Sequence, residues 1–311
     1  MVIILLLVVI LVIVLLFACR RNENFHEKFD IGNIGNQIIY LMECSVKRAM
    51  DRYGGRKYKY KEVYLVGMSN VPKYLDITKN ETVGFLDIPD KWYSFSNTIS
   101  LWNFGGLPRE LESMYFRYWK LCRPILNRMF KKYLKKVDVK CPVFHFRCSD
   151  IPMNRHMMYH IPKRAAVEKM IRIVKDKGYS KIILLNCTTH YTKSKRNGEM
   201  CREFCEYYVS IFKEHGVEVV IQCNSVVEDM ATMFYCPLLF SMNNSSFSFV
   251  VGVSRDPGTY VSTGLGKEYQ DRYKCLEQKD VDWIVLSDVP LLHREVDNYY
   301  KFSEVREKLE K

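Results

Sequence analysis

The sequence predicts an α/β protein with two domains, the second built on a parallel sheet. The chain has 311 residues, which is long enough for two domains of ordinary size. From Cys141 onward, short apolar runs alternate with amphipathic helical stretches, a pattern that implies crossover connections and a parallel sheet. A Lys/Arg-rich stretch around Lys131 to Lys136 marks the predicted boundary between the two domains. The second half is therefore expected to be a Rossmann-like layer.

The N-terminus predicts a membrane anchor. Val2 to Ala18 are seventeen consecutive residues without a charged or polar side chain, at the short end of the roughly 17–25 residues that span a bilayer. No basic residue precedes this segment, and Arg20 and Arg21 follow it, so an uncleaved transmembrane helix over 1–19 fits better than a cleaved signal peptide. The two arginines favour a cytoplasmic location for the part of the chain that follows them. Whether that part lies in the cytoplasm or in the lumen of the Golgi or endoplasmic reticulum is left open.

The first domain is predicted to begin after a polar stem over 20–27. A helix is expected to start near Asn36 and to end at Gly54, because apolar residues recur there at helical spacing. Glu62 to Val66 is predicted to be a strand. The region from Val71 to Pro108 is predicted to be rich in loops, and a helical stretch interrupted near Pro124 follows it.

In the second half, stretches that are predicted to be strands alternate regularly with stretches that are predicted to be helices. The predicted strands cover 142–147, 181–186, 217–222 and 237–242. The predicted helices run from Pro162 to Gly178, up to Gly216, over 226–235 and from Ser245 onward, since Gly and Pro punctuate their ends.

Charge and cysteine content restrict the partners. The net charge of +12 suits an anionic ligand, a nucleic acid or an anionic membrane, but no nucleic-acid-binding motif accompanies the basic clusters, so no nucleic-acid partner is predicted. The eleven cysteines are dispersed without zinc-type spacing. Cys141, Cys187, Cys223 and Cys236 lie in or beside apolar runs, so most of the cysteines are expected to be buried thiols.

The most informative segment is Cys141 to Asp150, where an apolar run ends in His145, Arg147 and Asp150. Ligands of open α/β sheets bind outside the carboxyl ends of the strands. Arg147 can hold a phosphate bidentately, and Asp150 can orient the guanidinium. A structural salt bridge between the two side chains is the alternative.

Two other predicted strand ends carry polar residues suited to a nucleotide diphosphate. Asp229 follows one strand and either caps a short helix or accepts hydrogen bonds from a guanine edge. Ser241 to Ser248 begins another helix, where hydroxyls and backbone N–H groups can bind a phosphate. His156 and His160 have a spacing that metal ligands use, but no third ligand is evident, so no metal is predicted.

Three of these blocks resemble one family, in the same order. Gly32-Asn-Ile-Gly-Asn-Gln37 resembles the opening segment of the α-1,2-fucosyltransferase family, and His145-Phe-Arg-Cys-Ser-Asp150 resembles its His-x-Arg-Arg-Gly-Asp motif, which α-1,6- and protein O-fucosyltransferases share in outline. The segment from Glu228 to Cys236, followed by Asn244-Ser-Ser-Phe-Ser-Phe249, resembles its late block. The resemblance covers about residues 30–255.

The resemblance implies a GT-B-like glycosyltransferase with two Rossmann-like domains facing a cleft. Its expected parts are an acceptor-side domain over 28–138, a nucleotide-sugar-binding domain over 139–265 and a C-terminal segment over 266–311 that packs back on both. The implied activity is inverting transfer of fucose from GDP-fucose to a glycan hydroxyl (galactoside 2-α-L-fucosyltransferase-like), with no metal or other cofactor. The implied partners are the nucleotide sugar, a glycan acceptor and, through the anchor, a membrane.

By this resemblance Arg147 and Asp150 are the expected catalytic residues, with Arg147 on the β-phosphate. His145 and Asp229 are expected at the guanosine end, and Ser245 and Ser246 at the phosphates. The full expected substrate-binding set is Gly32, Asn33, Gly35, Asn36, Gln37, His145, Arg147, Asp229, Asn244, Ser245 and Ser246.

The chain also departs from the family pattern. Cys148 replaces a second arginine, Ser149 replaces a glycine, and Phe249-Val250 replaces a pair of tryptophans. Asp150, Glu43 and His156 are all conceivable general bases for the acceptor hydroxyl. A glycosyltransferase with another nucleotide sugar, or a non-catalytic glycan-binding protein of the same fold, are the alternatives.

Overall fold

The structure is a computed structural model. It describes the following residues: 35, 38, 60–64, 91–95, 123–124, 126–148, 151, 160–186, 195–243, 245–255, 258–263, 283–286, 289–293 and 301–311. The predicted anchor at Val2 to Ala18 lies outside this part of the chain. Within the described part, no helix has the length and apolar character needed to cross a membrane.

The main structural unit is a parallel sheet of six strands in the order β6-β5-β3-β7-β8-β9. The α/β class and the parallel sheet predicted for the second half are thereby confirmed. The strands are β3 (Val143–His145), β5 (Lys181–Leu185), β6 (Glu218–Gln222), β7 (Leu238–Ser241), β8 (Thr259–Ser262) and β9 (Trp283–Val285).

The chain builds this sheet outward in two directions from its middle. After β3 it passes through helix α6 (Arg164–Asp176) to β5 and through α7 (Lys195–Glu214) to the edge strand β6. Helix α8 (Val226–Tyr235) then carries the chain back across to β7, and α9 (Ser246–Ser254) leads on to β8. Strands β3 and β7 are neighbours whose following connections diverge, which makes the space beyond their carboxyl ends a topological switch point.

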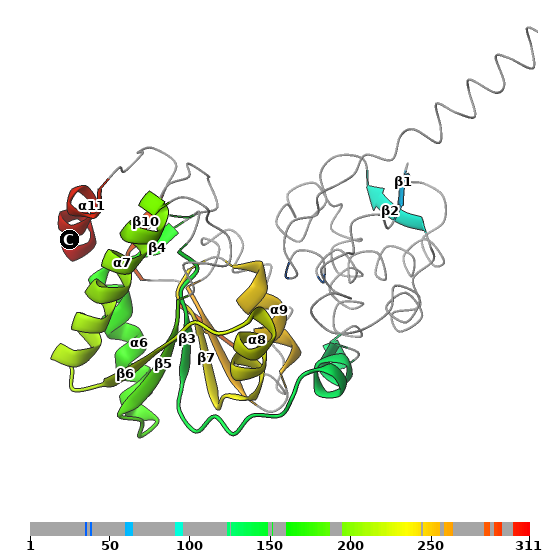
Figure 1. The fold of residues 1–311 in the computed structure, drawn as a ribbon, viewed down its shortest axis with the longest axis horizontal. Helices are drawn as coiled ribbons and strands as arrows, with labels where there is room; N and C mark the ends of the chain where they lie inside the picture. The colour runs from blue at the N-terminus through cyan, green and yellow to red at the C-terminus, as the bar shows by residue number, and fades with distance from the viewer. Residues whose placement is uncertain are drawn as a thin grey trace, which may run out of the picture.

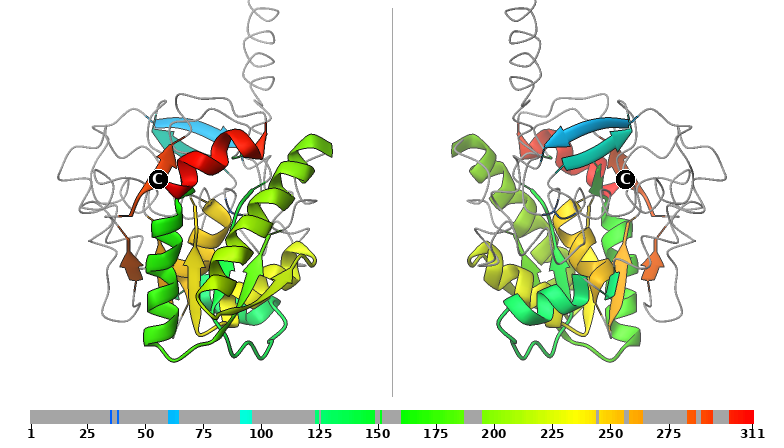
Figure 2. Two further views of the ribbon diagram at one scale, coloured as in Figure 1. Left: turned by 90° about the vertical axis from the view of Figure 1, so that its left-hand side faces the viewer. Right: turned by 90° about the vertical axis from the view of Figure 1, so that its right-hand side faces the viewer.

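The helices cover the two faces of the sheet in separate layers (Figure 1). Helices α6, α7 and the C-terminal α11 pack together on one face, and α8 and α9 pack together on the other. Figure 2 shows α11, in red, beside α6 and α7. Their bounds are α6 Arg164–Asp176, α7 Lys195–Glu214, α8 Val226–Tyr235, α9 Ser246–Ser254 and α11 Phe302–Glu310.

Local sequence explains where these helices begin and end. Helices α6 and α7 end before Gly178 and Gly216, whose positive φ angles of 80° and 69° glycine adopts without steric cost. Helix α8 begins with a capping box, in which Ser225 and Glu228 bond each other's backbone N–H groups. The hydrogen bonds from Ser225 lower the pKa of Glu228.

The core between the sheet and the layer of α6, α7 and α11, called the first layer below, is rich in aromatic side chains. The ring of Phe144 on β3 stacks on Phe240 of β7 with centroids 4.1 Å apart, and the edge of Phe212 on α7 meets it at 4.9 Å. Phe204 on α7 contacts Phe302 of α11 at 4.9 Å. Aromatic pairs of this geometry stabilise the packing beyond their buried area, so they fix α7 and α11 against the sheet.

Two short antiparallel pairs lie outside the parallel sheet. Strand β1 (Tyr60–Tyr64) pairs with β2 (Lys91–Phe95), so the strand predicted at Glu62 to Val66 exists two residues earlier. Strand β2 lies inside the stretch that was predicted to be rich in loops. Strand β4 (His160–Pro162), which was not predicted, pairs with β10 (Leu291–His293); three-residue strands are too short to show a period of two.

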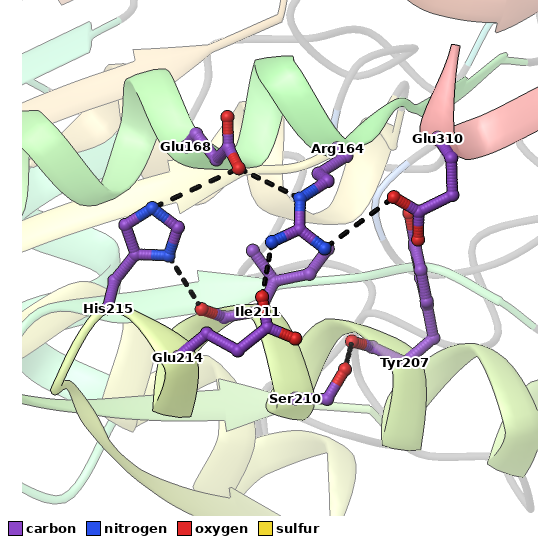
Figure 3. A network of polar contacts seen from close by, with 8 residues as sticks. All are labelled: Arg164, Glu168, Tyr207, Ser210, Ile211, Glu214, His215 and Glu310. Carbon is purple, nitrogen blue, oxygen red and sulfur yellow. Dashed lines mark hydrogen bonds and ion pairs between the residues drawn. The ribbon is translucent and has the colours of Figure 1, made fainter.

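Arg164 joins the three helices of the first layer (Figure 3). Its guanidinium contacts Glu168 of α6 at 2.9 Å, Glu214 of α7, and Glu310 of α11 at 3.5 Å. His215 extends the cluster, with Nε2 3.9 Å from Glu168. The network is partly exposed, so it contributes orientation more than stability.

Two glycines in helices predict opposite responses to the same substitution. A Cβ at Gly252 would lie 2.4 Å from the ring of Tyr260, whereas a Cβ at Gly198 would have no atom within 4 Å. We expect Gly252→Ala to lower the free energy of unfolding by about 1–3 kcal/mol because it overpacks the core. Gly198→Ala is expected to raise it by roughly 0.5–1 kcal/mol because alanine loses less backbone entropy. Chemical denaturation measures both, and equal signs for the pair would contradict the packing of α9 on β8.

Candidate functional site

The candidate site begins at the end of the central strand β3. In the sheet register, His145 lies between Leu185 of β5 and Ser241 of β7, and its ring meets Phe247 of α9 edge-on at 5.6 Å. Arg147 follows two residues later and is half-buried. The sequence prediction that both residues emerge at a strand end is confirmed.

Asn243, just beyond β7, connects the two central strand ends. Its Oδ1 accepts a hydrogen bond from the Arg147 backbone N–H at 3.0 Å, and its Nδ2 donates to the Arg147 carbonyl at 2.6 Å. Asn243 is only 1% exposed. The backbone of Arg147 is therefore fixed to the segment that leads into α9.

Helix α9 starts at the same rim of the sheet. Its N-cap, Ser245, makes no side-chain cap hydrogen bond, and the first intrahelical bond runs from Phe249 N–H to the Ser245 carbonyl. The N–H groups of the first turn, from Ser246 to Ser248, precede that bond. Such a helix start combines N–H donors with the positive end of the helix dipole, a combination that favours anions.

Gly35 lies directly against this helix start. A Cβ at Gly35 would be 2.5 Å from the backbone nitrogen of Phe247 and 2.7 Å from the carbonyl carbon of Ser246. Only glycine allows this approach of two backbones. Gly35 and Ile38 are both helical, which agrees with the predicted helix start near Asn36. Gly35 therefore meets the start of α9.

Protein groups satisfy the opposite end of α9. Asn127 Nδ2 donates to the Ser254 carbonyl at 2.7 Å, and an Arg123 Nη2 donates to the Arg255 carbonyl at 2.8 Å. The Arg255 side chain is fully buried and donates to the carbonyls of Phe234, Cys236 and Thr259. The negative end of α9 is thus surrounded by donors and cations, which leaves its positive end directed to the site.

Asp229 lies at the other side of the sheet rim, in the first turns of α8 beside the end of β6. Its Oδ1 accepts hydrogen bonds from Gln222 Nε2 at 2.8 Å and from the Asn224 N–H at 3.4 Å. Ser225 caps α8, so the capping alternative for Asp229 is wrong. Strand β5 separates β6 from β3, a spacing of about 10 Å at two strand widths. Asp229 therefore lies at the β6 end of the rim, whereas Arg147 lies in its middle, after β3.

The cysteine prediction needs a correction. Cys148, next to Arg147, forms a disulfide with Cys201 of α7, and Cys223 is also disulfide-bonded. Cys141, Cys205 and Cys236 are free thiols, as was expected for Cys141 and Cys236. A sequence without paired cysteine spacing cannot show that two segments 53 residues apart meet in space.

His160 belongs to a buried chain of hydrogen bonds. Its Nε2 lies 2.8 Å from Thr263 Oγ1, which in turn donates to the Met242 carbonyl at 3.2 Å. Because the hydroxyl proton goes to that carbonyl, the His160 Nε2–H donates to Thr263. In the part of the chain that the structure describes, no three His, Cys, Asp or Glu side chains gather as metal ligands would.

The structure thus brings together five of the predicted residues: Gly35, His145, Arg147, Ser245 and Ser246. Ser245 and Ser246 are 3% and 8% exposed, so both residues are buried. Asn243 was missed because the family resemblance points to Asn244; its position directly after a predicted strand was the available signal. The remaining predicted residues lie outside the described part of the chain: Gly32, Asn33, Asn36, Gln37, Asp150 and Asn244, together with the base candidates Glu43 and His156.

Comparisons with known proteins add a weak structural similarity. No protein-family model matches the chain, and no curated protein matches its sequence. A crystal structure of POFUT1 in complex with GDP shares 11% sequence identity with a TM-score of 0.26, over 48% of this chain and 48% of that one. A crystal structure of POFUT1 in complex with GDP-fucose shares 10% with a TM-score of 0.26, over 57% of this chain and 50% of that one. The chain thus spans about half the length of these structures, and a similarity of this size does not assign an activity.

The contact of Gly35 with α9 predicts an inverted glycine effect. In an ordinary helix Gly→Ala stabilises by about 1 kcal/mol. At Gly35 we expect Gly→Ala to destabilise, because the new methyl meets backbone atoms that cannot rotate away. The midpoint of thermal unfolding measures this, and Gly198→Ala is the matched control. A stabilised Gly35→Ala variant would show that the two segments do not meet.

The disulfide predicts a linked peptide and a loss of stability. Digestion without reductant should yield one fragment that joins Cys148 to Cys201. Cys201→Ser should lower the free energy of unfolding by about 4 kcal/mol, the chain-entropy value for a loop of this length. Cys205→Ser, one turn further along α7, removes a free thiol and is the control. Alkylation of both Cys148 and Cys201 in the native, unreduced protein would contradict the bond.

Proposed function

We propose that this chain is a membrane-anchored inverting glycosyltransferase that transfers fucose from GDP-fucose to a glycan hydroxyl, in an α-1,2-type linkage. The observation that carries the proposal is the convergence at one switch point of Arg147, the start of α9 and Gly35. Open α/β sheets bind their ligands at this place. The motif order along the sequence supplies the choice of donor.

The charges at this point suit a diphosphate. Arg147 offers five N–H donors in a planar fork, and the α9 start adds backbone donors and the helix dipole. In the proposed reaction the bond between the anomeric carbon and the β-phosphate oxygen breaks as the acceptor oxygen attacks from the opposite face. Negative charge then develops on the departing GDP, where fixed cationic donors contribute most to catalysis.

The guanosine end is proposed to extend along the rim toward β6. Asp229 lies in α8 beside the end of β6, and two strand widths, roughly 10 Å, separate β6 from β3. Gln222 and Asn224 donate to its carboxylate and fix its direction. A fixed carboxylate accepts hydrogen bonds from the donor edge of a purine such as guanine. The general base that takes the acceptor's hydroxyl proton is proposed to be Asp150, Glu43 or His156.

Cys148 gives the second candidate a specific basis. It occupies the position of the second arginine in the family motif and forms a disulfide, so it supplies no cation. A site with one cation fewer is compatible with another nucleotide sugar, and the donor has to be tested by comparison.

We further propose that the anchor over 1–19 holds the catalytic part on the lumenal side of the secretory pathway. Disulfides persist in oxidising compartments and are rare in the cytosol. The bonds of Cys148, Cys201 and Cys223 support this side, against the weaker indication from Arg20 and Arg21.

The deciding experiment measures nucleotide binding by calorimetry with the wild-type protein and Arg147→Ala. We expect GDP to bind the wild type, and Arg147→Ala to lose binding at the concentrations that saturate the wild type while remaining folded. Transfer from GDP-fucose should fall on the order of 10²–10³-fold, as for other lost transition-state donors. Arg172→Ala, which removes an exposed arginine on α6, is the matched control.

Three results would separate the candidates. Equal GDP affinity of the wild type and Arg147→Ala would refute the assignment of the site. Thermal stabilisation by a UDP-sugar but not by GDP would favour the other nucleotide-sugar donor. Direct glycan binding without release of sugar from any nucleotide donor would favour a non-catalytic binding protein.

A further inference from the structure

The Asn243 side chain makes hydrogen bonds to Arg147 where the backbone pairing of β3 and β7 has ended. The parallel pairing of the two strands ends at His145 and Ser241, with the Met242 N–H donating to the His145 carbonyl. In a continued parallel ladder the Arg147 N–H would donate to the Met242 carbonyl. That carbonyl instead accepts a hydrogen bond from Thr263, beyond β8. The Asn243 carboxamide takes over, and it satisfies both the N–H and the carbonyl of Arg147.

Because a side chain takes the place of a backbone partner, β3 and β7 can diverge while the N–H and carbonyl of Arg147 stay hydrogen-bonded. Strand β7 ends and turns into α9, while the backbone of Arg147 stays bonded as if the strand continued. The Ser241 hydroxyl supports the turn, since it donates to the Asn243 carbonyl at 2.8 Å. The Asn243 side chain therefore bridges the point where the two strands diverge, and it holds the backbone of Arg147 there.

Arg147 is held from its other side as well. The next residue, Cys148, is 2% exposed and is covalently bonded to Cys201 of α7. The backbone at Arg147 is thus held on one side by the two hydrogen bonds of the Asn243 side chain, which we call the Asn243 clamp. On the other side, the disulfide of the next residue links it to α7. Both constraints act on the backbone, so they fix the point from which the Arg147 side chain extends.

We propose that Asn243 is a positioning residue, which sets the direction of Arg147 toward the diphosphate. The inference rests on the proposed function for the identity of the ligand. Asn243 acts through Arg147 and not on the ligand, so its effect on binding should vanish once the Arg147 side chain is absent. A misplacement of a catalytic group by about 1 Å costs on the order of 10²-fold.

A double-mutant cycle on the full chain tests this dependence. GDP affinity is measured for the wild type, Asn243→Ala, Arg147→Ala and the double variant, at GDP concentrations high enough to quantify weak binding. We expect Asn243→Ala to weaken binding on the order of 10–100-fold. The double variant should bind no more weakly than Arg147→Ala alone, because residues that act through one another are not additive.

Asn127→Ala is the matched control. Asn127 is also a buried asparagine whose Nδ2 donates to a carbonyl, but it lies at the far end of α9. It should lower thermal stability by a similar amount and change GDP affinity less than twofold. Asn243→Ser, which keeps a polar group too short to bridge both backbone atoms, replaces Asn243→Ala if that variant does not fold.

A second measurement needs no ligand. Hydrogen exchange at the Arg147 amide should be slow in the wild type and in Asn127→Ala, and at least tenfold faster in Asn243→Ala, because the amide loses its acceptor. Unchanged exchange in Asn243→Ala would overturn the clamp itself.

The outcomes separate the two levels of the argument. If the wild type binds GDP and the cycle is additive, Asn243 acts independently of Arg147, and the inference fails while the proposed function stands. If the wild type binds no nucleotide diphosphate, the proposed function fails and the inference fails with it, whatever the exchange data show.

Discussion

The structure depends on the burial of helix α9. All but one of its nine residues are buried, so water cannot satisfy the polar groups at its ends and the protein must do so. At the carboxyl end, Arg123 donates to the Arg255 carbonyl and Asn127 donates to the Ser254 carbonyl. At the amino end, the helix meets the backbone of Gly35 and the rim of the sheet. Side chains of the protein thus satisfy the carboxyl end of α9, and its amino end, which is the positive end of the helix dipole, lies at the rim of the sheet.

The same burial explains why distant parts of the sequence meet at one place. Gly35, Arg147 and Ser245 are separated by about a hundred residues each, yet each lies at an end of an element that packs on α9 or beside it. The segments after β3 and β7 diverge at this rim, and the residues that meet there come from the loop after β3, from the start of α9 and from the helical Gly35. The sheet thus supplies a frame, and the segments beyond its strand ends supply the polar groups.

Much of the fold was predictable because its signals are local. The helix ends at Gly178 and Gly216, the helix over 226–235 and the alternation of strands and helices all follow from residues close together in the chain. The positions of His145 and Arg147 at a strand end followed from the same reasoning. The Cys148–Cys201 bond and the Asn243 clamp were not predictable, because each depends on which strands become neighbours. Short strands such as β4 also escaped, since three residues carry no periodicity.

The bridge between Cys148 and Cys201 also affects how the protein can be produced. Material made in a reducing cytosol, or purified with a thiol reductant, would lack the covalent tie beside Arg147. Such a preparation would keep the aromatic core but would hold the backbone beside Arg147 less tightly. A failure of such a sample to bind a ligand would reflect its redox history, so work on this chain begins with the choice of an oxidising expression host.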